Sequence, residues 1–119
     1  MRPTFHLVAA EVWRSADRRA AYAPASLADE GFIHCTDGES ELLATADRHY
    51  RDDPRPWLVL TVDLDAAGSP WRIDDPGGIY PHVFGPIDRR AILAVRPMDR
   101  AEDGRFTTIG PTSDGTPTR

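Results

Sequence analysis

The feature that most constrains this chain is the apolar run WLVLTVDL at residues 57–64. Apolar residues fill successive positions there instead of alternating with polar ones, so a strand formed by this run needs cover on both of its faces. Such a strand lies inside a sheet, because an edge strand or a solvent-facing strand would expose part of the run. The sequence therefore predicts a central strand, and the rest of the chain must supply its neighbours.

Shorter segments rich in strand-forming residues precede and follow this run. They are PTFHLVA at residues 3–9, GFIHC at 31–35, WRI at 71–73 and RAILAVRPM at 90–98, with a less regular segment, IYPHVFGPI, at 79–87.

Two main helices are expected, both in the N-terminal half. The first covers Ala10–Tyr22, where apolar residues recur at helical spacing. The second starts near Thr36, because Thr36 and Glu39 have the spacing of a capping box, and runs to about Tyr50. A short helical turn is expected just before Gly31. Helices early in the chain and strands late favour an α+β fold over an alternating parallel one.

The length of 119 residues is that of one domain. Residues 1–99 are expected to form it. Residues 100–119 are mainly Asp, Gly, Thr, Ser and Pro, a composition that buries little surface, so this segment is predicted to be a disordered C-terminal tail.

Composition excludes several classes of function. All 14 basic residues are arginine, which excludes a lysine Schiff base or a P-loop lysine. The net charge of −5 argues against extended nucleic-acid binding. Cys35 is the one cysteine, so no internal disulfide or multi-cysteine zinc site can form. No apolar segment is long enough for a membrane span or a signal peptide, and we expect a cytoplasmic protein.

Three of the four histidines lie between apolar residues in strand-like segments: His6, His34 and His82. Strand alternation places His34 on one face with Phe32 and Thr36, and it turns Cys35 to the other face. His82 shares its face with Tyr80 and Phe84 in the same way. Imidazoles beside aromatic rings suit a planar ligand with polar attachments, and imidazole is also a suitable general acid or base.

Other interpretations of these residues stay open. Each histidine taken singly fits a core residue whose ring nitrogens bond to backbone or carboxylate. A three-histidine metal site would need the imidazoles to converge on one ion, and their spacing gives no such indication. Arg48 and Arg72 lie near the histidine segments and are candidates for anion binding, although surface solvation explains them equally well.

Several of these segments together resemble a known family. They are HLV near the start, PASLADEGFIHCT at 24–36, PHVFGPI at 81–87 and AVRP at 94–97. They are similar to the small bacterial proteins grouped as domain of unknown function 952, over about residues 4–98. The resemblance implies an ADP-ribosyltransferase-like fold, a split β-sheet whose cleft holds NAD in active relatives.

By position, the resemblance implies that His6 contacts ribose and that His34 takes the second place. His82 takes the third place, where relatives often carry a glutamate that stabilises the sugar cation. Without that carboxylate, classical protein ADP-ribosylation is disfavoured, whereas 2′-phosphate transfer to NAD does not require it.

The leading hypothesis is therefore a histidine-lined cleft that binds NAD, ADP-ribose or a related nucleotide. NAD would be a substrate of a transferase, with no other cofactor expected. His6 would bind ribose hydroxyls, His34 would contact phosphate or act as acid and base, and His82 would line the cleft. Ring and charge contacts would come from Phe32, Tyr80, Phe84, Arg48 and Arg72. The alternatives are a non-catalytic metabolite-sensing or protein-interaction module and a three-histidine metal site, and the oligomeric state is left open.

Overall fold

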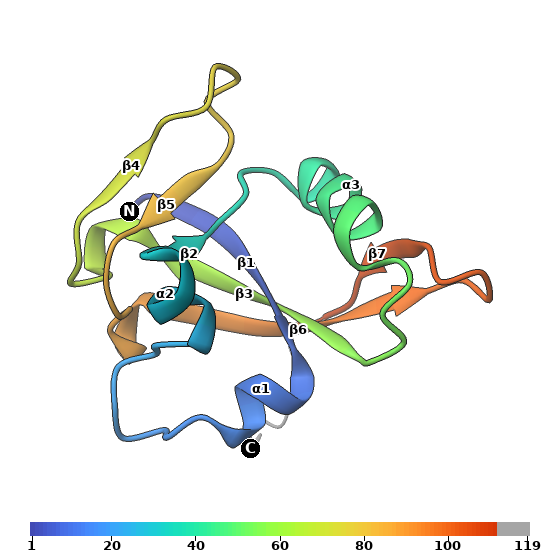
Figure 1. The fold of residues 1–119 in the computed structure, drawn as a ribbon, viewed down its shortest axis with the longest axis horizontal. Coiled ribbons are helices and arrows are strands. Elements are labelled where there is room, and N and C mark those ends of the chain that lie inside the picture. Colours follow the sequence, from blue (N-terminus) through green and yellow to red (C-terminus); the bar gives the residue numbers. More distant parts are fainter. Residues whose placement is uncertain (112–119) are drawn as a thin grey trace.

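The computed structural model describes residues 1–111 (Figure 1). Its strands are β1 (Pro3–Ala9), β2 (Ile33–His34), β3 (Trp57–Asp63), β4 (Trp71–Ile73), β5 (Pro81–Val83), β6 (Ile92–Arg100) and β7 (Phe106–Ile109). Its helices are α1 (Ala10–Ser15), α2 (Ala25–Glu30) and α3 (Glu39–Tyr50), with 3-10 turns η1 (Leu64–Ala66) and η2 (Arg89–Ala91).

The strands form two antiparallel sheets, which together with the few helices give an α+β fold. The larger sheet has the order β1-β3-β6-β7, and the smaller has the order β2-β5-β4. The prediction of an interior position for residues 57–64 is confirmed, because β3 pairs with β1 on one side and β6 on the other.

Burial on both faces of β3 explains its unbroken apolar run. Trp57 packs with Ala46 of α3 and Phe106 of β7 in one hydrophobic cluster. Leu58 and Leu60 point to the opposite face and join a second cluster that includes residues of the smaller sheet. Successive strand residues therefore enter different cores, as strand alternation requires.

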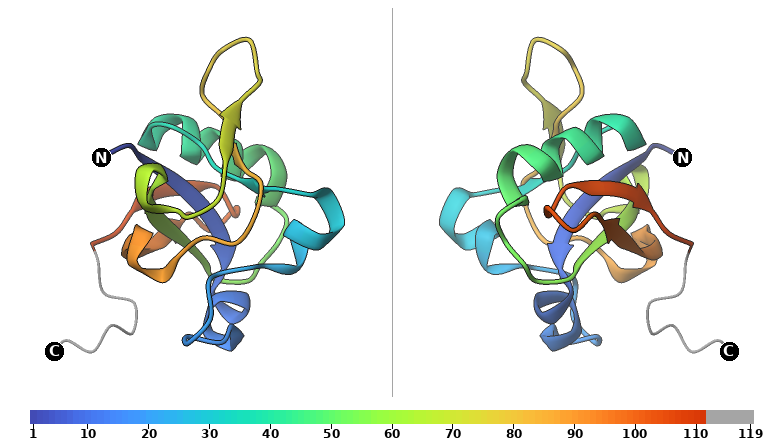
Figure 2. Two further views of the ribbon diagram at one scale, coloured as in Figure 1. Left: turned by 90° about the vertical axis from the view of Figure 1, so that its left-hand side faces the viewer. Right: turned by 90° about the vertical axis from the view of Figure 1, so that its right-hand side faces the viewer.

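Helix α3 covers one face of the larger sheet, as the two side views show (Figure 2). Leu42 and Ala46 lie one turn apart and are fully buried. Between them Leu43 packs on the cluster of Ala46, Ala44 is exposed, and Thr45 lines the site described below. No helix within residues 1–111 has the length and apolar character needed to cross a bilayer.

The two sheets meet where β2 runs on past His34. Phe5 of β1 and Thr36 exchange backbone hydrogen bonds of 3.1 and 2.8 Å. The predicted capping box at Thr36 is wrong, because the N-cap of α3 is Gly38, two residues later, and has no side-chain cap. Thr36 joins the sheets instead, and Gly38 takes a φ of 89° that only glycine adopts without strain.

Helix α1 is shorter than predicted and ends at Ser15. The guanidinium of Arg89 donates to the backbone oxygens of Ala20 and Asp17, each at 2.8 Å. Tyr22 then forms a two-way backbone bridge to Ile87. These tertiary bonds satisfy carbonyls that a continued helix would have used, so the loop is stable without helical bonds.

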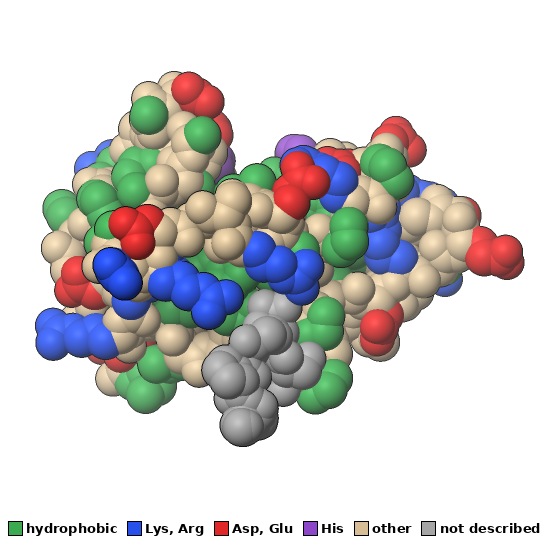
Figure 3. All heavy atoms as spheres, turned by 90° about the horizontal axis from the view of Figure 1, so that it is seen from below, with side chains coloured by type: hydrophobic (Ala, Val, Ile, Leu, Met, Phe, Trp, Pro, Cys, Tyr) green, Lys and Arg blue, Asp and Glu red, His purple; other side chains and the backbone are tan. Residues whose placement is uncertain are grey.

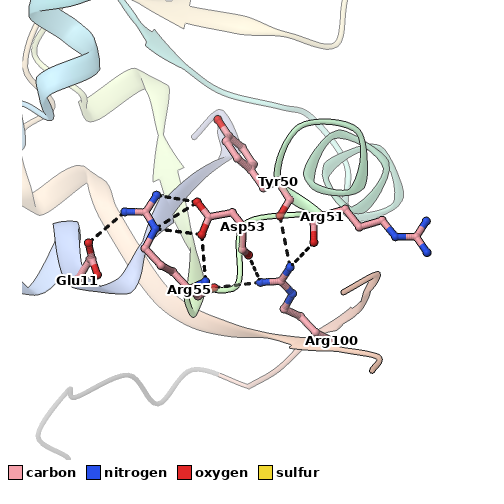
Figure 4. Close-up of polar contacts among 6 residues, drawn as sticks. All are labelled: Glu11, Tyr50, Arg51, Asp53, Arg55 and Arg100. Atoms are coloured by element: carbon pink, nitrogen blue, oxygen red, sulfur yellow. Dashed lines mark hydrogen bonds and ion pairs between the residues drawn. The ribbon is translucent and has the colours of Figure 1, made fainter. Parts of the chain in front are cut away.

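The structure also differs from the predicted disordered tail, because residues 100–111 are ordered. Phe106 is buried beneath the guanidinium of Arg100, 4.3 Å from its ring centroid. Arg100 also donates to the backbone oxygens of Tyr50, Arg51, Asp53 and Arg55, which ties β6 to the end of α3 (Figure 4). The burial of Phe106 and the hydrogen bonds of Arg100 hold this segment on the fold despite its polar composition. The remainder of the predicted tail, residues 112–119, lies outside the described residues.

Candidate functional site

A cleft of about 530 Å³ opens where the larger sheet, the smaller sheet and α3 meet. This volume is in the range of small-molecule sites. Seen from below, the molecule has a notch along its upper edge, and histidine side chains are visible there (Figure 3). The lining residues come from β1, α2, β2, α3 and β5 and include three of the candidate site histidines: His6, His34 and His82.

His34 and His82 lie opposite each other on β2 and β5. Their rings meet edge to face, with centroids 5.2 Å apart. The structure thus brings together two imidazoles that are 48 residues apart in sequence, by antiparallel pairing of two short strands. No residue within 1–111 hydrogen-bonds to the ring nitrogens of His82, so they are available to a ligand.

Phe32 and Phe84 contact this histidine pair but are not part of the cleft lining. Phe32 stacks on His82 with ring centroids 4.1 Å apart and meets His34 edge-on at 4.6 Å. Phe84 lies beneath the guanidinium of Arg72, which also pairs with Asp74 at 3.0 Å. The cleft lining does not include Phe32, Phe84 or Arg72, so their contact with a ligand stays a prediction.

Glu30 of α2 orients His34. Helix α2 ends at Gly31, whose left-handed conformation turns the chain directly into β2. This turn places the Glu30 carboxylate 2.8 Å from Nε2 of His34. Nε2–H donates a hydrogen bond to the carboxylate, so Nδ1 of a neutral ring is free to accept a proton. This is the arrangement of a general base held by an acidic partner.

His6 has no free ring nitrogen. Its Nδ1 lies 2.7 Å from the backbone oxygen of His34, which can only accept, so Nδ1 carries the proton. Its Nε2 lies 2.8 Å from the hydroxyl of Tyr22, which then donates. Burial lowers the pKa of His6 to about 4 and keeps the ring neutral. The geometry therefore gives His6 a supporting position below His34 and leaves no nitrogen for ribose.

Burial and the neighbouring His34 also lower the pKa of His82. At neutral pH its ring is uncharged and can accept a proton. The Cys35 thiol is buried below the histidines, and burial raises its pKa to about 12, so it is not a thiolate nucleophile. No group of three metal-ligating side chains is present within residues 1–111.

Another part of the cleft lining comes from α3 and from the segment that precedes β5. Nη2 of Arg48 donates to the Tyr80 hydroxyl at 3.1 Å and to Oγ1 of Thr45 at 3.4 Å. Asp75 holds the turn before Tyr80 by accepting the backbone N–H groups of Ile79 and Tyr80. Burial alone would raise the pKa of Asp75, but these N–H groups outweigh it and lower the pKa.

The floor of the cleft includes an open strand edge at Leu7. Phe5 directs its N–H and C=O to Thr36, away from β3. Strand geometry alternates these directions, so the N–H and C=O of Leu7 point the same way, beyond the end of the bridge. They offer a donor and an acceptor to a ligand with an amide-like group.

Comparison with known proteins places this geometry in a family. The profile of the family described as "Protein of unknown function (DUF952)" matches residues 7–95. The chain belongs to the DUF952 family. The match covers two of the three site histidines, His34 and His82, and begins one residue after His6.

A solved structure supports the fold. The crystal structure of protein CC0527 from Caulobacter crescentus has a TM-score of 0.71 and 20% sequence identity, and the match covers 88% of this chain and 93% of that one. A double mutant of CC0527 gives the same values. At this identity the likeness shows the fold alone. No curated protein matches the chain.

Several lining residues of this DUF952 chain were not predicted from the sequence: Ser26, Glu30, Thr45, His49, Tyr50 and Asp75. Thr45, Arg48 and His49 are three and four residues apart on α3, a spacing that indicates a shared helix face. Glu30 is four residues before His34, but a carboxylate across a helix-to-strand turn has no recognisable spacing. The α3 residues could have been found from sequence, whereas Glu30 required the turn geometry.

Proposed function

We propose that this cleft binds a nucleotide-derived ligand of the NAD or ADP-ribose class, in the cytoplasm. The observation that carries the proposal is the pair of accessible imidazoles, His34 and His82, facing Arg48 and Tyr80 in one cleft of about 530 Å³. Imidazole and guanidinium N–H groups suit phosphate and sugar oxygens, while the ring of Tyr80 suits a base.

We also propose that the fold is of the ADP-ribosyltransferase-like type. Two antiparallel sheets join through a short bridge at Phe5 and Thr36, and the cleft opens at that junction. A split sheet with its ligand at the split is the arrangement that the family resemblance implies. The exposed donor and acceptor of Leu7 at the same place would suit a carboxamide such as that of nicotinamide.

The histidine pair further supports a transferase. Glu30 holds His34 through Nε2, whereas no carboxylate oxygen of residues 1–111 lies within 4 Å of a ring nitrogen of His82. In a transfer from NAD, one imidazole can accept the proton of the attacking hydroxyl, while nicotinamide leaves as a neutral molecule without taking up a proton. The other imidazole can then bind a ribose or phosphate oxygen. His6 would position His34 in this scheme instead of touching the ligand.

Isothermal titration calorimetry with NAD, ADP-ribose and nucleoside monophosphates tests the binding proposal. We expect wild-type protein to bind at least one of them and His34→Ala to bind it at least about tenfold more weakly, as for loss of a charge-assisted hydrogen bond. Arg105→Ala, at an exposed site in the β6–β7 turn, is the control and should bind like wild type. Absence of binding by the wild type would overturn the proposal.

A second candidate, a non-catalytic metabolite-sensing module, is favoured by the position of His6. Both nitrogens of this ring serve the fold, so one of the three predicted catalytic histidines has no chemical role to play. Incubation with NAD followed by separation of nicotinamide and ADP-ribose products distinguishes the two candidates. Binding without any product identifies the module, and product formation that is lost in His82→Ala identifies the transferase.

A further inference from the structure

We infer that Arg48, with the hydroxyls of Thr45 and Tyr80, forms a phosphate-binding subsite in the cleft. The inference rests on the proposed function, since the phosphate would belong to the nucleotide-derived ligand. It adds the location of the anionic group, at Arg48 and Thr45 of α3 and at Tyr80, in the cleft that His34 and His82 also line.

The first argument is the charge state of Arg48 compared with other arginines. Five arginines pair with a carboxylate at 2.6–3.1 Å: Arg2, Arg51, Arg55, Arg72 and Arg96. Arg48 contacts two hydroxyl groups and forms no ion pair with any carboxylate of residues 1–111. Its positive charge is therefore not matched by a protein anion in the part of the chain that the structure describes.

The second argument is the fixed position of the guanidinium. Nη2 is held between Tyr80, which directly precedes β5, and Thr45 of α3, so the guanidinium contacts both segments. The Nε and Nη1 atoms have no hydrogen-bond partner within residues 1–111. A planar guanidinium with donors left over suits two oxygens of one phosphate, and the hydroxyls beside it offer further contacts.

The third argument concerns the two carboxylates that line the cleft, Glu30 and Asp75. Glu30 accepts a hydrogen bond from His34, and Asp75 accepts two from backbone N–H groups. Oε1 of Glu30 and both carboxylate oxygens of Asp75 are thus already bound by donors of the protein. The donors that remain for a ligand are the guanidinium of Arg48, the hydroxyls of Thr45 and Tyr80 and the one N–H of a neutral His82 ring, and these favour an anion.

The test uses the full chain and four probes: inorganic phosphate, pyrophosphate, ADP-ribose and adenosine. Arg48→Gln keeps a polar, hydrogen-bonding side chain and removes the charge. Arg51→Gln is the matched control, three residues further along, because Arg51 is exposed and pairs with Asp103 away from the cleft. Binding is measured by calorimetry, with NMR chemical shifts of the backbone amides to locate each probe.

We expect pyrophosphate and ADP-ribose to shift the amides of α3 and β5 and to bind Arg48→Gln about tenfold or more weakly. Arg51→Gln should bind like wild type, and any adenosine binding should be equal in all three proteins. Tyr80→Phe removes one of the two hydrogen bonds that fix the guanidinium of Arg48, so it should weaken the binding of ADP-ribose less than Arg48→Gln does.

The outcomes separate this inference from the proposed function. Equal binding of ADP-ribose by wild type and Arg48→Gln would overturn the subsite and leave nucleotide binding intact. Arg48-dependent binding of pyrophosphate without binding of any nucleotide would support the subsite and overturn the nucleotide ligand. Absence of binding by every probe would overturn both.

Discussion

At the scale of single residues, His6 shows how a polar side chain can be fully enclosed in a core. Its two ring nitrogens have complementary partners, an acceptor at the backbone oxygen of His34 and a donor at the hydroxyl of Tyr22. A buried imidazole with both nitrogens satisfied avoids the free-energy penalty of an unpaired polar group. This arrangement works only while the ring is neutral, because a protonated Nε2 and the Tyr22 hydroxyl would both be donors.

Stability should therefore fall in mild acid through His6. The pKa of His6 is lowered to about 4 in the fold from 6.5, so between these pH values the unfolded chain binds a proton that the folded chain does not. This contribution is complete above pH 6.5 and is lost as the pH falls toward 4. The shift corresponds to a loss of roughly 3 kcal/mol in the free energy of unfolding.

Urea unfolding at several pH values between 7.5 and 4.5 would measure this dependence. His49→Gln, at an exposed ring, should keep the slope of stability against pH, and His6→Gln should flatten it. An unchanged slope in His6→Gln would contradict the assignment of the acid sensitivity to this ring.

Tyr22→Phe tests the donor in the same pair. The substitution keeps the buried ring and leaves Nε2 of His6 without a partner, so we expect the free energy of unfolding to fall by about 1–3 kcal/mol. Tyr80→Phe is the control, because its hydroxyl is near the solvent-accessible cleft and should affect stability much less. Thermal unfolding of both variants at pH 7.5 gives the comparison.

At the scale of elements, the C-terminal strand depends on very few contacts. Phe106 is the buried residue of β7, and its backbone N–H donates to Asp47 of α3 at 2.7 Å. Arg100 covers the ring and binds the carbonyls at the end of α3 (Figure 4). Strand β7, helix α3 and the loop to β3 are therefore held by one shared cluster.

Phe106→Ala should destabilise this cluster strongly. Loss of a buried phenyl ring typically lowers the free energy of unfolding by about 3–5 kcal/mol. Thr107→Ala, the exposed neighbour on the other face of β7, is the control and should change it by less than about 0.5 kcal/mol. Denaturant unfolding measures both, and hydrogen exchange should show the protection of β7 and the end of α3 falling together in Phe106→Ala.

Local pattern was sufficient for some elements and insufficient for others. The predicted first strand agrees with β1, and the short helix before Gly31 agrees with α2, because burial alternation and a left-handed glycine are local signals. Helix α1, the capping box and β7 could not be predicted, since each is decided by a distant partner. These partners are Arg89 for the loop after α1, Phe5 for Thr36, and Arg100 with Asp47 for Phe106.

The same limit applies to the site. The pairing of His34 with His82 follows from strand alternation once the strands are paired, but the sequence does not state which strands pair. Phe32, Phe84 and Arg72 were expected at the ligand because they share a face or a segment with the histidines. In the structure Phe32 stacks on His82 and Arg72 lies over Phe84, and none of the three residues is part of the cleft lining.

At the scale of the whole molecule, the junction of the two sheets depends on Asp37. Its carboxylate accepts two hydrogen bonds from the Arg2 guanidinium, at 3.1 and 2.6 Å, and one of 2.7 Å from the Thr4 hydroxyl. Its backbone N–H donates to Ile79, which continues the smaller sheet. One residue thus connects the start of β1 to the strand pair that carries the cleft histidines.

Asp37→Asn should loosen this junction. The amide cannot pair with the Arg2 charge, and the loss of charge-assisted hydrogen bonds in a half-buried position should lower stability by about 1–3 kcal/mol. Hydrogen exchange should quicken in β2 and β5 more than in β3 and β6. Asp65→Asn, an exposed partner of the N-terminal amine, is the control, and equal effects of the two variants would contradict a special role for Asp37.

The buried thiol below the histidines gives this junction a built-in reporter. Cys35 is 1% exposed and is the single cysteine of the chain, so each molecule can take up at most one alkylating group. The closed protein shields that sulfur, so alkylation requires the sheets to separate. The rate of alkylation, followed by mass spectrometry, therefore reports the rate or extent of that separation. A ligand that contacts both sheets in the cleft would slow the alkylation of Cys35 even if it induced no change in shape.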